Sequence, residues 1–168
     1  RLQPLPAALQ AQDQQVARVT GQSSELTGFL VVGENGEQAL QRLEALGERL
    51  RPLRQQGVIT DYRLLSDSLP SVARQHADYQ ALSQLQPEVL ARLGQAGITV
   101  AATVPPFAPL KPEAWLASPV SEGLRLLWLG NARGEVAILV PVNGVREASQ
   151  LQAATQGLAG VHWQDKRQ

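Results

Sequence analysis

The stretch TGFLVVGENGEQALQRLEALGERLRPLRQQG, residues 27–57, decides the fold class of this chain. Its opening is an apolar run rich in β-forming residues, which predicts a strand over Thr27–Gly33. After a turn, apolar side chains recur at helical spacing and predict a helix over about Glu37–Gln56. A second strand is predicted at Val58–Leu65. The apolar stripe of the helix consists of Ala39, Leu40, Leu43, Leu46, Leu50 and Leu53.

The last third of the chain returns to the same alternation of strands and helix. Residues 124–130 and 135–142 are predicted strands, linked by a hairpin turn at 131–134. Because the first of them is apolar on both faces, we expect it to be central in the sheet or covered. A helix over about Val145–Gln156 and a final strand over about Gly160–Gln164 complete the pattern.

The segment between these halves, residues 66–123, is predicted to be mostly helical. Ser68 is expected to cap a helix that runs to about Gln84. Pro87 is expected to open a second helix that ends near the glycines at 94 and 97, since proline favours the first helical turn and glycine the end.

The order of these elements predicts an α+β fold of the ferredoxin-like kind. Removing the central segment leaves a split β-α-β arrangement, in which four antiparallel strands carry both helices on one face. We therefore divide the chain into an N-terminal region, a first half, a mostly helical insertion and a second half. These regions are residues 1–26, 27–65, 66–123 and 124–168. In the N-terminal region, Ala7–Thr20 is expected to be a helix or an extended arm.

Composition excludes several classes of function. The chain has 168 residues, 43% of them hydrophobic, and no formal net charge, which is typical of a globular domain without a nucleic-acid partner. It lacks cysteine, so disulfides and thiolate metal sites are excluded. It also lacks methionine and begins with Arg1, so we expect a piece of a longer protein. No apolar run approaches the roughly 20 residues that span a bilayer.

No catalytic, cofactor-binding or metal-binding group is predicted. The two histidines, His76 and His162, lack a nucleophile and an orienting partner at recognisable spacing, and we interpret both as surface residues. The run Gly33–Gly36 joins a strand to a helix but has neither the phosphate-loop ending nor the dinucleotide spacing. We therefore expect a protein that is not an enzyme.

The region 98–112 is rich in proline, so regular structure is not expected there before a short helical turn at Pro112–Ala117. It is also apolar, and two interpretations stay open. The loop covers the open face of the sheet, or it contacts a hydrophobic substrate or a partner domain. The candidate contact residues are Phe107, Leu110, Trp115 and Leu116.

Several short motifs, in this order and spacing, resemble an extracytoplasmic loop of predicted exporters. These exporters form the mycobacterial-membrane-protein-large (MMPL) branch of the resistance-nodulation-division superfamily, and the similarity is closest to their second large loop. The resemblance spans about residues 27–166. Its motifs are Gly28–Val32, Tyr62–Ser66, Leu69–Ser71 with Gln75, Leu127–Gly130 and Gly160–Lys166.

The resemblance implies a porter domain on the periplasmic side of the bacterial inner membrane. The parent would be a proton-driven exporter of lipids, fatty-acyl compounds, polyenes or other hydrophobic molecules, and this domain would gate transport by changing conformation. The expected partners are the other periplasmic loop and the membrane helices of the same transporter, with a hydrophobic substrate or periplasmic carrier as further candidates. The alternative is a soluble ferredoxin-like module that binds a small ligand or regulates a partner.

Overall fold

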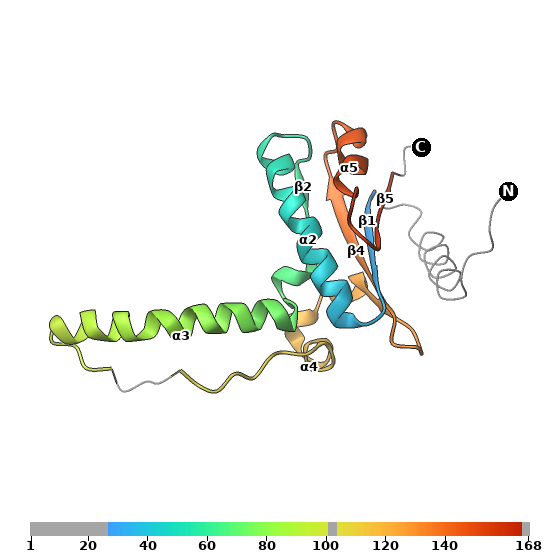
Figure 1. Ribbon diagram of the computed structural model, residues 1–168. Coiled ribbons are helices and arrows are strands. Elements are labelled where there is room, and N and C mark those ends of the chain that lie inside the picture. Colours follow the sequence, from blue (N-terminus) through green and yellow to red (C-terminus); the bar gives the residue numbers. More distant parts are fainter. Residues whose placement is uncertain (1–26, 101–103, 166–168) are drawn as a thin grey trace.

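A computed structural model describes residues 27–100 and 104–165, which form an open antiparallel sheet with helices (Figure 1). The N-terminal helix or extended arm expected at 7–20 lies outside the described residues. The strands are β1 (Gly28–Gly33), β2 (Asp61–Tyr62), β3 (Trp128–Gly130), β4 (Val136–Asn143) and β5 (Val161–Gln164). The helices are α2 (Gly36–Gln55), α3 (Val72–Gln95), α4 (Pro112–Ala117) and α5 (Ala148–Ala154), with 3₁₀ turns at Leu65–Asp67, Pro119–Ser121 and Arg125–Leu127.

The sheet has the order β2-β4-β1-β5, and β3 also pairs with β4. β1 lies between β4 and β5, with Phe29 opposite both Val140 and Trp163. Over the described residues all five predicted strand regions contribute to one sheet, whereas the ferredoxin-like arrangement that we expected has four strands. The difference arises because β4 is long enough to share one edge between two short strands. β2 pairs with its C-terminal end at Val142, and β3 pairs with its N-terminal half around Ile138.

Two predicted strands are much shorter than the sequence suggested. The strand expected at 58–65 is reduced to β2, because Val58 and Ile59 are buried in the turn that follows α2. There Gly57 has a positive φ and the Val58 N–H donates to the carbonyl of Leu53, which closes the helix. Of the two alternatives for 124–130, a central strand is wrong, whereas the short strand that forms there is partly covered, with Trp128 and Leu129 packed against the clusters on either face of the sheet. A 3₁₀ turn occupies the first part of this segment, and β3 lies at the edge beside β4.

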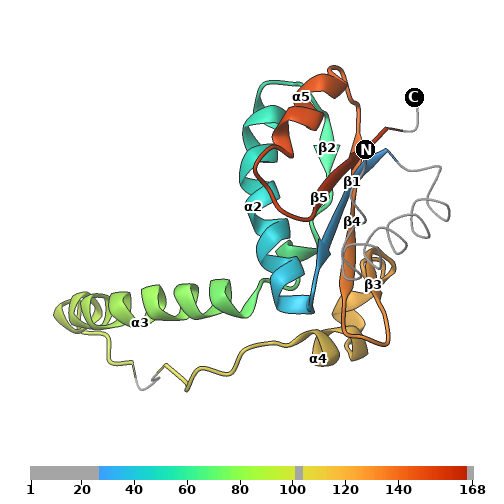
Figure 2. The same cartoon turned by 45° about the vertical axis from the view of Figure 1, so that its right-hand side comes forward.

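The helix α2 forms the core with one face of the sheet. Asn35 caps it, its side chain accepting a hydrogen bond from the N–H of Gln38 at 2.8 Å. Helix α5 packs on the same side of the sheet (Figure 2), where Leu151 joins the cluster that contains Phe29 and Leu43. The opposite face of the sheet has its own buried cluster of Leu30, Val32 and Ala137, with Leu129 and Leu139 packed against it. Both faces of β1 are therefore buried.

The central segment contains one long helix where two were expected. α3 starts after Ser71, whose side chain accepts from the N–H of Arg74, so Ser71 and not Ser68 is the cap. Pro87 lies inside α3 and does not open a new helix. A proline removes one helical hydrogen bond, and on an exposed helix water can satisfy the carbonyl that is freed. The described residues of 98–111 lack regular structure and α4 has the expected bounds, so these two predictions are confirmed.

None of the helices in the described residues has both the length and the apolar character that a membrane crossing requires.

Candidate functional site

The feature that distinguishes this molecule is an arm that leaves the body beside the N-terminus of α2 (Figure 1). We define the arm as α3 together with the return segment, residues 98–100 and 104–111. The body is the sheet with α2, α4 and α5. No residue of α3 is buried, whereas α2 buries a complete apolar stripe. The position of α3 is therefore set by contacts at the base of the arm and by contacts with the return segment.

The base of the arm is held by two glutamates of α2. Glu37 accepts hydrogen bonds from the N–H groups of Val72 and Ala73, at 2.7 and 3.1 Å, which are the first donors of α3. Glu44 accepts from the backbone N–H of Ser71 at 2.9 Å and from its hydroxyl at 2.7 Å. Carboxylates at a helix N-terminus satisfy donors that lack partners within the helix and complement the helix dipole.

Together these contacts complete the N-terminus of α3. The buried Ser71 hydroxyl accepts from Arg74, and the Ser71 carbonyl accepts from Gln75, so each N–H from Ser71 to Gln75 has a partner. The direction of α3 is consequently fixed by several charge-assisted bonds to a single rigid helix.

Sequence reasoning missed this anchor. Glu37 and Glu44 lie outside the apolar stripe predicted for this helix, and the sequence assigned no partner to them. The available signal was their spacing of seven residues, which puts both carboxylates on one stripe of the helix. A polar stripe beside an apolar one is common on exposed helices, so the spacing alone could not indicate that a second helix begins there.

The return segment is attached to α3 near its base. The Gln75 side-chain amide donates to the carbonyl of Leu110 at 2.9 Å and accepts from the N–H of Leu110 at 2.7 Å. The Tyr79 hydroxyl donates to the carbonyl of Pro105 at 2.6 Å. Phe107 lies between two aromatic rings, 5.1 Å from that of His76 and 5.3 Å from that of Tyr79. His76 thus serves packing of the arm.

The four predicted contact residues are divided between the two regions. Phe107 and Leu110 lie on the arm, where Leu110 is partly exposed. Trp115 is completely buried in the body, and its indole N–H donates to the Ser68 hydroxyl at 2.8 Å. Leu116 is partly buried against the same core. Trp115 therefore offers no surface to a ligand in this structure, and contact through the arm residues stays a prediction.

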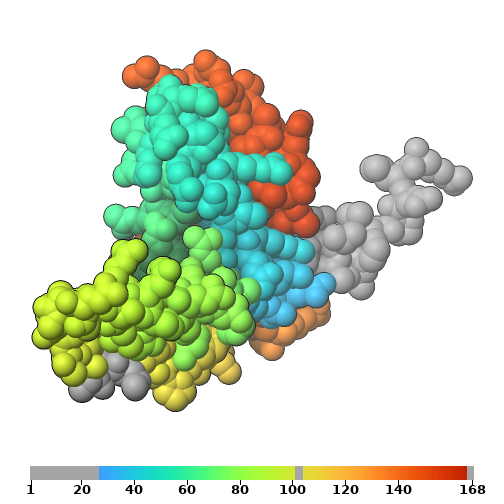
Figure 3. All heavy atoms as spheres, turned by 60° about the vertical axis from the view of Figure 1, so that its left-hand side comes forward, coloured from blue at the N-terminus to red at the C-terminus, as the bar shows by residue number. Residues whose placement is uncertain are grey.

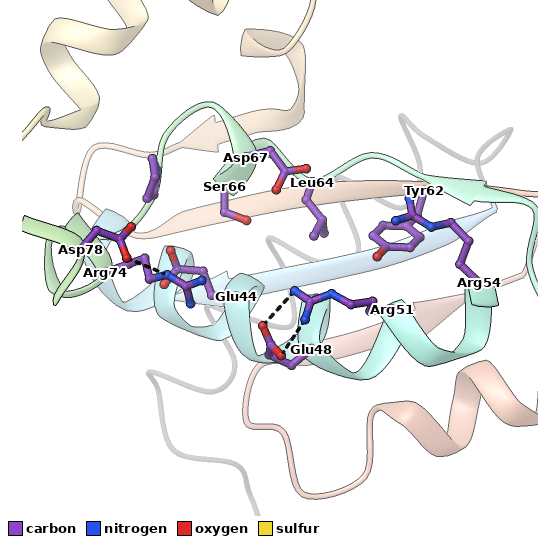
Figure 4. Close-up of a pocket in the computed structure, with 12 residues that line it drawn as sticks. Glu44, Glu48, Arg51, Arg54, Tyr62, Leu64, Ser66, Asp67, Arg74 and Asp78 are labelled. Carbon is purple, nitrogen blue, oxygen red and sulfur yellow. Dashed lines mark hydrogen bonds and ion pairs between the residues drawn. The ribbon is translucent and has the colours of Figure 1, made fainter. Parts of the chain in front are cut away.

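An open pocket of about 340 Å³ lies at the base of the arm, between α2, β2 and the start of α3 (Figure 4). Its walls carry arginines and carboxylates in similar numbers, and the arginines already face carboxylates. Arg51 lies 3.2 Å from Glu48, and Arg74 lies 3.7 Å from Asp78. The third, Arg54, lies over the ring of Tyr62 and 3.5 Å from Asp61. Such a balanced surface selects neither an anionic nor a cationic ligand.

The side chains that could bind a metal ion are scattered over the described part of the chain. No group of three or more potential metal-ligating side chains is found there. His162 lies on the outer strand β5 opposite Leu30, and its side chain is exposed.

Comparisons with known proteins identify no relative of this chain. No protein-family model matches the chain, and neither the curated proteins nor the solved structures yield a significant match.

Proposed function

We propose that this chain is an extracytoplasmic porter domain of a proton-driven inner-membrane exporter of hydrophobic molecules. In this proposal the domain performs no catalysis. It moves as a unit when the membrane helices of the parent rock, and it opens or closes a path for substrate. The motif resemblance to the second large loop of MMPL-type exporters supports the class of the parent.

We further propose that the body is ferredoxin-like. Support comes from the strand order, since β5, β1, β4 and β2 form one antiparallel sheet in which each β-α-β half contributes two strands. The packing of α2 and α5 on the same cluster also agrees with this topology. In this arrangement β3 is an addition to one edge, and residues 66–123 are an insertion that carries the arm.

The observation that carries the functional proposal is the anchored arm. A rigid helix bonded at its base by Glu37 and Glu44 turns with α2 and transmits a small rotation of the body over its whole length. The 24 residues of α3 correspond to about 36 Å at 1.5 Å per residue. Such a lever suits a domain that couples the motion of the parent's membrane helices to its other periplasmic loop.

The test uses the complete protein that the gene encodes, reconstituted in vesicles with a proton gradient. We expect the gene to continue on both sides into membrane-spanning segments, and the vesicles to export a hydrophobic probe such as a fluorescent fatty acid. The double substitution Glu37→Ala and Glu44→Ala should reduce export by about tenfold, because the arm no longer follows the body. The control Glu48→Ala removes only an exposed ion pair and should leave export unchanged.

A gene that encodes no membrane-spanning segment would overturn the proposal. A second assay distinguishes the proposed porter domain from the alternative, a soluble ligand-binding module. The isolated chain is titrated with fatty acids, phospholipids and polyenes, and we expect weak binding or none, because the described pocket is polar and charge-balanced. Tight one-to-one binding would favour the soluble module.

A further inference from the structure

The outer half of α3 exposes a stripe of large apolar side chains. Leu82, Leu85 and Val89 are 60%, 54% and 50% exposed, and their spacing of three and four residues puts them on one side of the helix. In Figure 3 the arm projects toward the viewer at the lower left of the molecule. The stripe lies about a quarter turn from the side that carries Gln75 and Tyr79, which hold the return segment.

Charged residues continue the stripe at both ends with the same spacing. Asp78 precedes Leu82 by four residues, and Arg92 follows Val89 by three. Both charged side chains are exposed, and Asp78 also lies 3.7 Å from Arg74, four residues earlier in the same helix. We call Asp78, Leu82, Leu85, Val89 and Arg92 the seam. Its alternation of four and three residues is the pattern by which two helices pack side by side, with an apolar centre and opposite charges at the two ends.

The charges at the two ends of the seam favour a second copy of α3 as the partner helix, in one orientation. If a second copy of α3 lies antiparallel with Leu85 at the two-fold axis, Asp78 of each copy faces Arg92 of the other. Both residues lie seven positions from Leu85, or about 10 Å along the helix. Leu82 then packs near Val89 of the second copy. A parallel pairing would instead bring Asp78 against Asp78 and Arg92 against Arg92, and like charges in contact are unfavourable.

We propose that two copies of this chain associate through their seams as an antiparallel, two-fold symmetric pair of α3 helices. The pairing buries apolar side chains that are otherwise exposed to water. Ser71, at the base, is 14 residues from Leu85, about 21 Å, so the two bodies lie well apart on opposite sides of the contact. A contact of two single helices is smaller than the roughly 1,200 Å² of stable complexes, so the association is weak and depends on protein concentration.

Sedimentation equilibrium of the whole 168-residue chain over a wide range of concentration tests the pairing. We expect a monomer–dimer equilibrium that Leu85→Asp weakens by about tenfold or more, because it places two carboxylates at the axis. Leu126→Asp is the matched control. Leu126 is also an exposed leucine, 79% accessible, but it lies in the body and off the seam, so this substitution should leave the equilibrium unchanged.

The orientation is tested by charge reversal and by cross-linking. Asp78→Arg and Arg92→Asp should each weaken association, and the double variant should restore it to within a few-fold of the original. Because the chain has no cysteine, the single variants Asp78→Cys and Arg92→Cys report the orientation directly. Oxidation of their mixture should yield mainly the mixed disulfide.

Circular dichroism checks that every variant keeps its helix content. A wild-type chain that stays monomeric at all concentrations would overturn the proposal. So would equal effects of Leu85→Asp and Leu126→Asp, or disulfides formed only between identical variants. This inference is independent of the proposed transport function, since dimerisation is measured on the chain alone.

Discussion

The body and the arm of this molecule are stabilised by different forces. The body buries two apolar clusters, one on each face of β1, whereas α3 in the arm buries no residue. The arm depends on hydrogen bonds to Glu37 and Glu44 at its base and to Gln75 along its return segment. This difference shows that the burial of apolar side chains defines the fold of the body, whereas polar contacts set the direction of the arm. Substitutions in the two regions should therefore differ in kind as well as in size.

The largest expected effect comes from a leucine of the body. Leu43 of α2 is completely buried in the main cluster, so Leu43→Ala leaves a cavity and should lower the free energy of unfolding by about 2–5 kcal/mol. The same substitution at Leu82, on the exposed stripe of α3, should change it by less than about 0.5 kcal/mol. Urea unfolding followed by circular dichroism measures both variants, at a protein concentration low enough to exclude dimers. Equal losses of stability would contradict the division into body and arm.

An intermediate effect is expected at the base of the arm. The double substitution Glu37→Ala and Glu44→Ala leaves the N-terminal donors of α3 without their carboxylate partners, at a cost of about 1–3 kcal/mol. We expect this cost to appear as local opening. Hydrogen exchange should speed up for the amides at the start of α3 and stay unchanged for those of β1.

The variant Glu48→Ala is the control for the double substitution at the base of the arm. Glu48 lies on the same helix, and among the described residues its carboxylate pairs with the exposed Arg51, so exchange in α3 should not change. Faster exchange in β1 of the double variant would show that the arm and the body unfold together, which contradicts the separation of the two regions.

The comparison also explains how much of the structure could be predicted. The strand and helix over residues 27–56 were predicted closely, because a local apolar pattern, the cap and Gly57 all agree. The hairpin turn was predicted for a local reason too. Gly134 has a positive φ, and the Asn131 side chain accepts from the N–H groups of Arg133 and Glu135. Where structure is decided by neighbours in sequence, the sequence was sufficient.

The errors lie where structure is decided by contacts distant in sequence. The leucines around 124–127 satisfy a strand pattern, but Leu124 and Leu127 pack against the core from a 3₁₀ turn while Leu126 points to solvent. Trp115, one of the four candidate contact residues, lies in the core, where its N–H finds the Ser68 hydroxyl. The anchor of Glu37 and Glu44 depends on residues 71–73, and no local pattern indicates such a pairing.

The smallest expected effect is at Gln75, which sharpens the comparison within the arm itself. Gln75→Ala removes the paired bonds to Leu110 and a third to the carbonyl of Pro70. Because the two bonds to Leu110 lie at the surface, where water can replace them, and the bond to Pro70 is only partly buried, we expect less than about 1 kcal/mol of global destabilisation. Exchange at the Leu110 amide should nevertheless rise clearly, since its acceptor is gone. The control Gln80→Ala alters an exposed glutamine five residues further along α3 and should leave that amide unaffected. If Gln75→Ala instead destabilised the whole chain as much as Leu43→Ala, the return segment would belong to the cooperative core, and the arm could not be treated as a separate element.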